Sequence, residues 1–199
     1  MQGIKLKHSY YQNIDTINLS KNILGKKLVT NINNQVTSGI IVETEAYLGI
    51  HDKACHTFNN KSTNRTKVMY GESGFAYVYL CYGIHSLFNI VSNDIDKPEA
   101  VLIRAIEPID GISLMLERRN LKKKSYNLTN GPGKLSQALG INNTFNGLSL
   151  FNNNLWVEDI NNNILSDNII CGKRVGINFA GEDAKLPYRF YIKNNNWVS

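Results

Sequence analysis

The feature that most constrains this chain is a pair of β-forming segments that flank a short turn. Residues 77–81 (YVYLC) and 87–91 (LFNIV) consist mainly of aromatic and aliphatic side chains, and residues 82–85 (YGIH) separate them. Two such runs around a glycine-containing turn predict a β-hairpin. Side-chain alternation places Tyr77 and Tyr79 on one face of the first strand. The fold is therefore expected to contain antiparallel β-structure.

A long strand is predicted upstream of this hairpin, over residues 36–47. Because side chains alternate between the two faces of a strand, Glu43, Glu45 and Tyr47 are expected to share one face. Residues 49–74 follow as a polar segment without a helix or strand pattern. A loop of this length without structure of its own is usually functional or flexible.

The remaining predicted elements are short helices and strands. They are a helix capped by Asp15 or Thr16, strands over 27–32 and 100–106, a helix capped by Asp110, a helix opened by Gly131-Pro132-Gly133, and a tail of strands and Asn-rich turns over 156–197. The sequence shows no internal repeat and no interdomain linker. We expect one compact α+β domain over residues 1–199, with mixed helices and strands, a mostly antiparallel sheet and a protruding β-hairpin.

Composition narrows the function classes. The 199 residues carry a formal net charge of +6, and 42% of them are hydrophobic, which is enough for a core and argues against disorder. The positive excess favours a polyanionic partner through phosphate contacts, although the same charge also serves solubility. Three separated cysteines without CxxC spacing give no disulfide framework or metal motif. With no signal peptide or membrane span in the sequence, we expect a cytoplasmic protein.

Two charged residues are candidates for catalysis. Glu45 lies on a predicted strand beside an aromatic residue and just before the polar loop, where a carboxylate can act as a general base toward water. The alternative is a solvated strand residue paired with a lysine. Arg104 interrupts an otherwise apolar strand, so it needs a partner if it is buried. It either orients the water with Glu45 or forms a structural ion pair with Glu43 or Glu107.

The aromatic residues suggest recognition of a planar ring. Tyr47 and Tyr79 are suited to stack on a base, which contributes roughly 1–3 kcal/mol per base. Tyr82, beside Gly83 in the predicted turn, is expected at an exposed tip, where it can enter DNA as a wedge. The alternative is ordinary core packing of a tyrosine-rich strand. His56 lacks the spacing of a metal motif and is better suited to hydrogen bonding with a bound base.

A basic turn adds a candidate phosphate contact. Residues 131–134 (GPGK) precede a predicted helix, whose first amides and the Lys134 ammonium can bind a phosphate; a plain capping turn is the alternative. The basic run over residues 118–124 is interpreted as a solvated helix end.

Together these motifs resemble the alkyladenine (3-methyladenine) DNA glycosylases. The matching segments are VETEAYLG, the ACHT histidine, Thr63 with Arg65, YVYLCYG, Asn89, LIRAIEP, NGPGKLSQALG, RVGINFAGE and LPYRFYIKNNNWVS. They occur in the family's order and cover nearly the whole chain. Residues 178–179 (NF) depart from it, because some animal members have a Gly-His pair there.

The resemblance implies a monofunctional hydrolase of base excision repair. Such an enzyme flips an alkylated or deaminated purine out of duplex DNA and hydrolyses its N-glycosidic bond, leaving an abasic site. By motif position, Glu45 would deprotonate the attacking water, which Arg104 and the backbone carbonyl of Val175 would help to hold. No metal or organic cofactor is implied.

The resemblance also implies how DNA is bound. Tyr47, His56 and Tyr79 would form the base pocket, with Asn89 under the base, where the family's asparagine is thought to obstruct the exocyclic amine of guanine. The hairpin would insert into the minor groove, and Tyr82 would fill the gap left by the flipped nucleotide.

Further contacts and partners follow from the same resemblance and from the basic residues. Thr63, Arg65 and Lys134 are expected at the DNA backbone. The expected partner is double-stranded DNA with damaged purines, bound by a monomer that needs no protein partner and no membrane and associates with a bacterial nucleoid.

Two other classes remain open from the residues alone. One is a non-catalytic nucleic-acid-binding domain, and the other is a nucleoside hydrolase or transferase. Tyr82 is useful to a duplex binder but not to a nucleoside hydrolase. Glu45 is useful to an enzyme but not to a passive binder, because a carboxylate repels phosphates.

Overall fold

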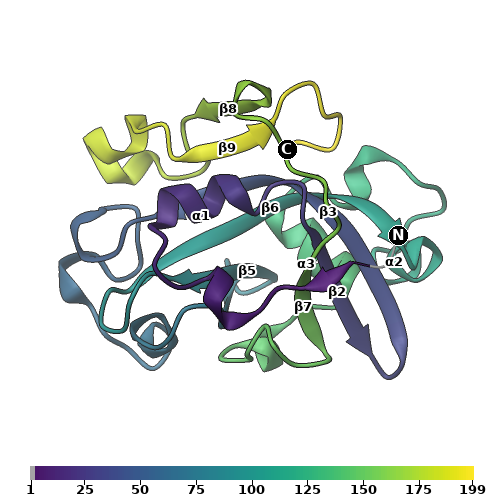
Figure 1. The fold of residues 1–199 in the computed structure, drawn as a ribbon, viewed down its shortest axis with the longest axis horizontal. Helices are drawn as coiled ribbons and strands as arrows, with labels where there is room; N and C mark the ends of the chain where they lie inside the picture. The colour runs from purple at the N-terminus through teal and green to yellow at the C-terminus, as the bar shows by residue number, and fades with distance from the viewer. Residues whose placement is uncertain (1–2) are drawn as a thin grey trace.

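An antiparallel sheet forms the centre of the computed structural model, which describes residues 3–199 (Figure 1). Within these residues the sheet has nine strands, in the order β1-β7-β2-β3-β6-β5-β4, with β9 added to β3 and β8 added to β9. The strands are β1 (Ile4–Lys5), β2 (Lys27–Ile32), β3 (Gln35–Tyr47), β4 (Ala76–Cys81), β5 (His85–Ser92), β6 (Glu99–Asp110), β7 (Leu155–Asp159), β8 (Ile169–Gly172) and β9 (Arg189–Ile192). The predicted α+β class with a mostly antiparallel sheet is confirmed.

Three short α-helices flank the sheet: α1 (Thr16–Asn22), α2 (Ile112–Arg118) and α3 (Pro132–Leu139). Asp15 caps α1 by accepting a hydrogen bond from the Asn18 amide at 2.9 Å, as the sequence predicted. Pro132 starts α3 and Gly140, at φ +74°, ends it. Across residues 3–199, no helix has the length and hydropathy needed to cross a bilayer.

The predicted cap of the second helix is wrong. Asp110 does not cap α2; it is the last residue of β6, and its carboxylate accepts a hydrogen bond from the Ser38 hydroxyl on β3. Gly111 occupies the cap position at φ +72°, without a side-chain hydrogen bond. Strand β6 therefore extends to Asp110, beyond the predicted strand over residues 100–106. Asp110 pairs with Ser38 of β3 at this end of the sheet.

The two longest strands, β3 and β6, pair along most of their length and carry the candidate charged residues. Their register shifts on both sides of Glu43, which marks a bulge. One edge of β3 is shared: β2 pairs with residues 35–40, and β9 pairs with residues 43–45. This arrangement brings the C-terminal part of the chain beside the carboxylates of β3.

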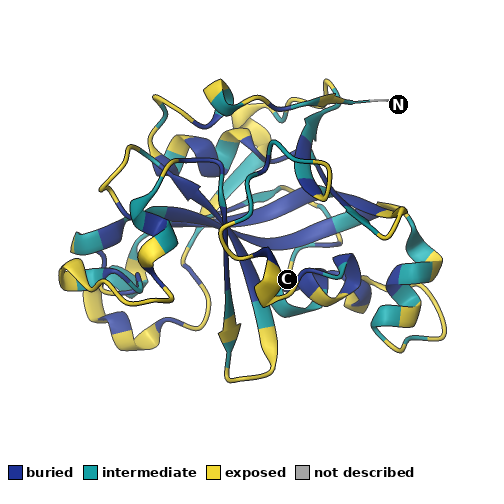
Figure 2. Ribbon diagram, turned by 90° about the horizontal axis from the view of Figure 1, so that it is seen from below, coloured by how far each residue is buried: buried dark blue, intermediate teal, exposed yellow. Residues whose placement is uncertain are grey.

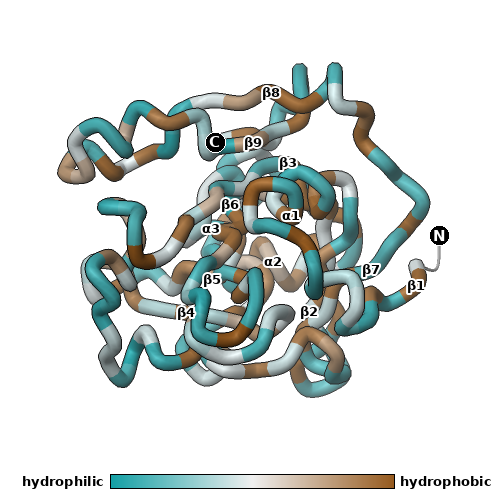
Figure 3. The backbone as a smooth tube through the Cα atoms, turned by 60° about the vertical axis from the view of Figure 1, so that its left-hand side comes forward, coloured by the Kyte–Doolittle hydropathy of each residue, from teal (hydrophilic) through white to brown (hydrophobic). Residues whose placement is uncertain are grey.

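The helices and sheet enclose one large hydrophobic cluster. Helix α1 packs against β3 and β6, and α3 packs against β5 and β6. The cluster includes Leu19 of α1, Phe88 and Ile90 of β5, Ile103 of β6 and Leu135 of α3, all fully buried. Figure 3 shows brown, hydrophobic stretches around these elements, whereas the outer loops are largely hydrophilic. Burial of apolar area on this scale stabilises the sheet that holds the site.

The β4–β5 hairpin projects from the body of the protein with an exposed tip (Figure 2). Cys81 pairs with His85, so a three-residue loop over 82–84 closes the hairpin. Tyr82 and Gly83 both have positive φ, at +51° and +74°. The side chain of Tyr82 is 91% exposed. The predicted hairpin is confirmed, and its tip carries a large aromatic ring into solvent.

Candidate active site

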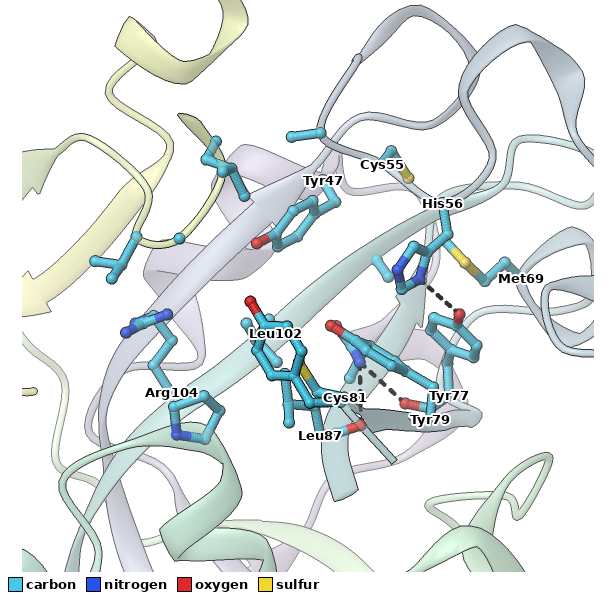
Figure 4. Close-up of a pocket in the computed structure, with 18 of the residues that line it drawn as sticks. Tyr47, Cys55, His56, Met69, Tyr77, Tyr79, Cys81, Leu87, Leu102 and Arg104 are labelled. Carbon is cyan, nitrogen blue, oxygen red and sulfur yellow. Dashed lines mark hydrogen bonds between the residues drawn. The ribbon is translucent and has the colours of Figure 1, made fainter. Parts of the chain in front are cut away.

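A cavity of about 340 Å³ opens beside the hairpin (Figure 4). This volume is in the range of pockets that bind small organic molecules. Five separate parts of the chain form its wall: the end of β3, the 49–74 segment, the hairpin with β6, Pro132 at the start of α3, and the segment after β8. Among its lining residues are seven of the predicted site residues: Tyr47, His56, Tyr79, Tyr82, Asn89, Arg104 and Val175.

Aromatic rings form one side of the cavity. Tyr77 and Tyr79 stack with ring centroids 5.5 Å apart, and His56 meets Tyr79 edge-on at 4.5 Å. The Tyr77 hydroxyl lies 2.8 Å from Nδ1 of His56. Burial, and then the charges of Arg65 and Lys61, lower the pKa of His56 to about 4. The imidazole is therefore neutral at pH 7, and it offers one donor and one acceptor.

Asn89 forms part of the cavity floor and is almost fully buried. Its side-chain amide donates to the backbone carbonyl of Tyr77 at 3.1 Å and to that of Leu87 at 3.4 Å. These bonds keep the amide group in one place. Asn89 is therefore a rigid feature of the cavity.

Glu45 lies directly behind the cavity wall and has no exposed surface. Its Oε1 accepts a hydrogen bond from the Val175 amide at 2.7 Å and lies 3.3 Å from Nη1 of Arg104. Its Oε2 accepts a hydrogen bond from the Tyr47 hydroxyl at 2.8 Å. The alternative of a solvated residue paired with a lysine is therefore wrong. The shared face predicted for Glu45 and Tyr47 is confirmed.

Burial is the main influence on Glu45. It raises the pKa of the carboxyl above its ordinary value, while Arg104, the Val175 amide and the Tyr47 hydroxyl act in the opposite direction. A carboxylate with a raised pKa is a stronger base when ionised. Tyr47, Arg104 and Val175, which contact this carboxylate, all line the cavity, so they lie between Glu45 and the cavity.

Arg104 contacts both glutamates of β3. Its Nε donates to Glu43 at 3.0 Å, and its Nη1 forms the ion pair with Glu45. The guanidinium also lines the cavity. Arg104 is therefore both a structural ion-pair partner and a group available to the site. Val175 contacts Glu45 through its amide N–H, whereas the sequence expectation concerned its carbonyl.

The three residues expected at the DNA backbone lie outside the cavity wall. The Thr63 hydroxyl accepts from the Thr66 amide at 3.2 Å and so stabilises a local turn. The Arg65 guanidinium lies 5.9 Å from the Tyr79 ring centroid. The Lys134 ammonium donates to Asn130 at 2.9 Å. Arg65 thus lies over the ring of a residue that lines the cavity.

Sequence reasoning missed a buried ion pair that supports the site. Asp52 and Arg174 form a bidentate pair, and Asp52 also accepts from the amides of Leu48 and Ala54. The Arg174 guanidinium lies 4.8 Å from the ring centroid of Tyr47. Asp52 lies in the segment expected to lack structure, which instead contains short 3-10 helices at Gly49–His51, Phe58–Asn60 and Lys67–Tyr70. The one sequence signal was that Arg174 directly precedes Val175.

Phe179 is a second residue that sequence reasoning left without a role. It lines the cavity and is 76% exposed, so it forms an apolar part of the rim. Among the described residues, His, Cys, Asp and Glu side chains form no group of three or more that could hold a metal ion.

Comparison with known proteins shows the family of the chain. The model of the methylpurine-DNA glycosylase family matches residues 9–196. The chain belongs to the methylpurine-DNA glycosylase family, a class of DNA-repair hydrolases.

Several bacterial relatives match over almost their full length, each under the name "Putative 3-methyladenine DNA glycosylase". The relative from Natranaerobius thermophilus is 46% identical over 198 residues, which cover 98% of this chain and 99% of the relative. The one from Chlamydia abortus is 46% identical, covering 95% and 100%. The one from Bacillus cereus is 45% identical, covering 96% and 97%.

The Asp52–Arg174 pair generates a stability prediction. Asp52→Asn leaves a fully buried guanidinium without its counter-charge, so we expect the free energy of unfolding to fall by about 3–5 kcal/mol. Urea denaturation at pH 7 measures this change. Glu182→Ala is the control: it removes an exposed ion pair with Lys185 and should cost about 0–1 kcal/mol. Equal losses in both variants would show that Asp52 does not support the site.

Proposed function

We propose that the protein excises damaged purines of the 3-methyladenine type from double-stranded DNA by hydrolysing the N-glycosidic bond. The observation that carries this proposal is the position of Glu45. It is a fully buried carboxylate directly behind an aromatic cavity, held by three groups that line that cavity. A passive binding domain gains nothing from a buried base at this position, whereas hydrolysis requires one.

Base flipping is supported by the shape of the site. The aromatic cavity lies beside the hairpin, and a base within the duplex stack cannot enter it. The rings of Tyr47 and Tyr79 offer flat surfaces on which an extruded purine can stack. In this proposal Tyr82 enters the minor groove and fills the vacated space, which its exposure at the hairpin tip supports. The net charge of +6 favours approach to the phosphate backbone.

The contacts of Glu45 indicate which oxygen takes the proton. Oε1 is contacted by both Val175 and Arg104, whereas Oε2 accepts only from Tyr47. A carboxylate oxygen has two lone pairs, so Oε2 retains one for the attacking water. The water oxygen then bonds to the sugar C1′ as Glu45 takes its proton. The C1′–N bond breaks, and its electron pair leaves with the purine.

The substrate itself assists this departure. Alkylation at a ring nitrogen gives the purine a positive charge that the departing electron pair neutralises. Normal guanine lacks this charge and carries an exocyclic amine that Asn89 obstructs. The fixed position of the Asn89 amide supports this exclusion, because the floor cannot move aside at low cost.

The test of the proposed function is incubation with end-labelled duplexes, each with one 3-methyladenine, 7-methylguanine, hypoxanthine or ethenoadenine. Alkali then cleaves the strand at abasic sites. We expect cleavage with one or more lesions and none with an undamaged duplex. Free methylated nucleosides are the control for a nucleoside hydrolase. Intact strands with all four lesions would overturn the proposal.

Glu45→Gln tests the proposed base. The variant should bind lesion duplex normally and excise the base about 10²–10⁴-fold more slowly. It should also be no less stable than the wild type at pH 7. A folded-state pKa raised above the unfolded value means that the ionised carboxylate destabilises the fold above the unfolded pKa. Thermal unfolding checks stability, and wild-type turnover would exclude Glu45 from the mechanism.

Tyr82→Ala tests the wedge. Because the ring is exposed, the substitution should leave folding unchanged while weakening binding to a lesion duplex more than binding to the corresponding single strand. Fluorescence anisotropy with both probes measures the difference. Ile95→Ala, at another exposed apolar position, is the matched control and should change neither affinity. Equal weakening on both probes would contradict the wedge role.

Borohydride treatment tests monofunctional chemistry. None of the residues that line the cavity in the described chain is a lysine, so no side-chain amine is placed to form a Schiff base with the sugar. We expect no covalent protein–DNA adduct after borohydride is added during excision, as judged on a denaturing gel. A trapped adduct would indicate a lyase mechanism.

A further inference from the structure

Glu43 is a buried carboxylate to which the proposed mechanism assigns no role. It has no exposed surface and is not among the residues that line the cavity. Three donors converge on it: Nε of Arg104 at 3.0 Å, Nε of Arg189, and the amide of Ser199 at 2.7 Å. These donors come from β6, β9 and the C-terminal segment, so Glu43 joins three parts of the chain at one point.

The bond to Glu43 limits how Arg104 can meet Glu45. A guanidinium often holds a carboxylate through two parallel hydrogen bonds. Here Nε is used by Glu43 and Nη2 donates to the Ser199 hydroxyl at 3.1 Å. The closest contact with Glu45 runs from Nη1 to Oε1, at 3.3 Å, and the hydrogen bond to Oε2 comes from Tyr47 rather than from Arg104. Oε2 of Glu45 therefore accepts no hydrogen bond from the Arg104 guanidinium.

We propose that Glu43 is a positioning residue for glycosidic bond hydrolysis: it holds Arg104 by one edge, so that Glu45 keeps Oε2 available as the base. The inference rests on the proposed function, because it assigns Glu43 a role only if Glu45 activates water. Without the Glu43 charge, the guanidinium is free to turn and pair with Glu45 through two bonds. That pairing would occupy the oxygen the water needs.

The charges in the cluster predict the direction in which the pKa of Glu45 changes when Glu43 is neutralised. The charge of Glu43 raises the pKa of Glu45, whereas that of Arg104 lowers it. The groups that face Glu45 from the surrounding elements are Glu43 and Tyr47 of β3, Arg104 of β6, Arg189 of β9, Tyr79 of β4 and Arg174 after β8. Neutralising Glu43 removes a charge that raises the pKa of Glu45. It also frees Arg104, whose charge lowers that pKa, to pair more closely with Glu45. Both effects lower the pKa of Glu45.

The experiment is Glu43→Gln, assayed by single-turnover excision from lesion duplex across a pH series. Activity requires ionised Glu45 and falls as the pH drops through its pKa. In the variant this acid limb should move to lower pH, and the plateau rate should fall roughly three- to tenfold, because the base is weaker. Affinity for lesion duplex should remain at the wild-type value, because Glu43 does not line the cavity.

Two further variants separate positioning from folding. Glu43→Asp keeps the charge and should return the acid limb toward the wild-type position. Arg189→Lys weakens the competing donor at Glu43 but leaves the Glu43 charge and a positive charge beside the cluster. Glu43 then draws Arg104 more strongly away from Glu45, and the acid limb should move to higher pH. If Glu43→Gln does not fold, the direction of the Arg189→Lys shift decides the question.

The outcomes distinguish the two proposals. Wild-type protein that releases no base from any lesion duplex overturns the proposed function. Active wild-type protein with an acid limb that is unmoved or raised in Glu43→Gln overturns only the role of Glu43. A lower plateau without a shift in pH dependence would show that Glu43 serves stability alone.

Discussion

The structure depends on a cluster of buried charge in the middle of the sheet, where Glu43 and Glu45 of β3 meet Arg104 of β6 and Arg189 of β9. Removing ions from water costs several kcal/mol each, and only close pairing and additional hydrogen bonds offset that cost. The local arrangement provides these partners. A bulge surrounds Glu43, β9 joins β3 at this point, and Ser199 donates its amide. The cluster therefore connects segments that are distant in the sequence, alongside the strand pairing and core contacts that they also make.

The buried charge cluster lies next to the aromatic cavity and shares residues with it. The carboxylate of Glu45 is kept away from bulk water, where its basicity would be ordinary, yet its donors Tyr47, Arg104 and Val175 all face the cavity. A molecule that fills the cavity thus meets the same groups that hold the Glu45 carboxylate in place. Preorganised contacts of this kind are worth most in a site with little water, because they need no rearrangement during the reaction. Asp52 and Arg174 extend this rigidity to Tyr47.

Much of this organisation could be predicted from local patterns. Alternation on a strand placed Glu45 beside Tyr47, and an arginine within an apolar strand implied a buried partner. The cap of α2 was predicted wrongly, because Asp110 bonds across strands to Ser38 rather than to its own helix. The Asp52–Arg174 pair was missed, since 122 residues separate its members and neither shows a local pattern. Long-range ion pairs leave no periodic signal.

By itself, the sequence determined the hairpin with Tyr82 at its tip, the long β3 strand with its two glutamates, and the charge that suits a nucleic acid. These features follow from side-chain alternation, turn chemistry and composition, all of which act over a few residues. Only the tertiary structure decided that Glu45 lies behind the cavity rather than in it, that Val175 contacts it through the N–H, and that Glu43 shares Arg104 with it. Burial and partner choice depend on which distant strands pack together, and the pairing of β3 with both β6 and β9 settles them.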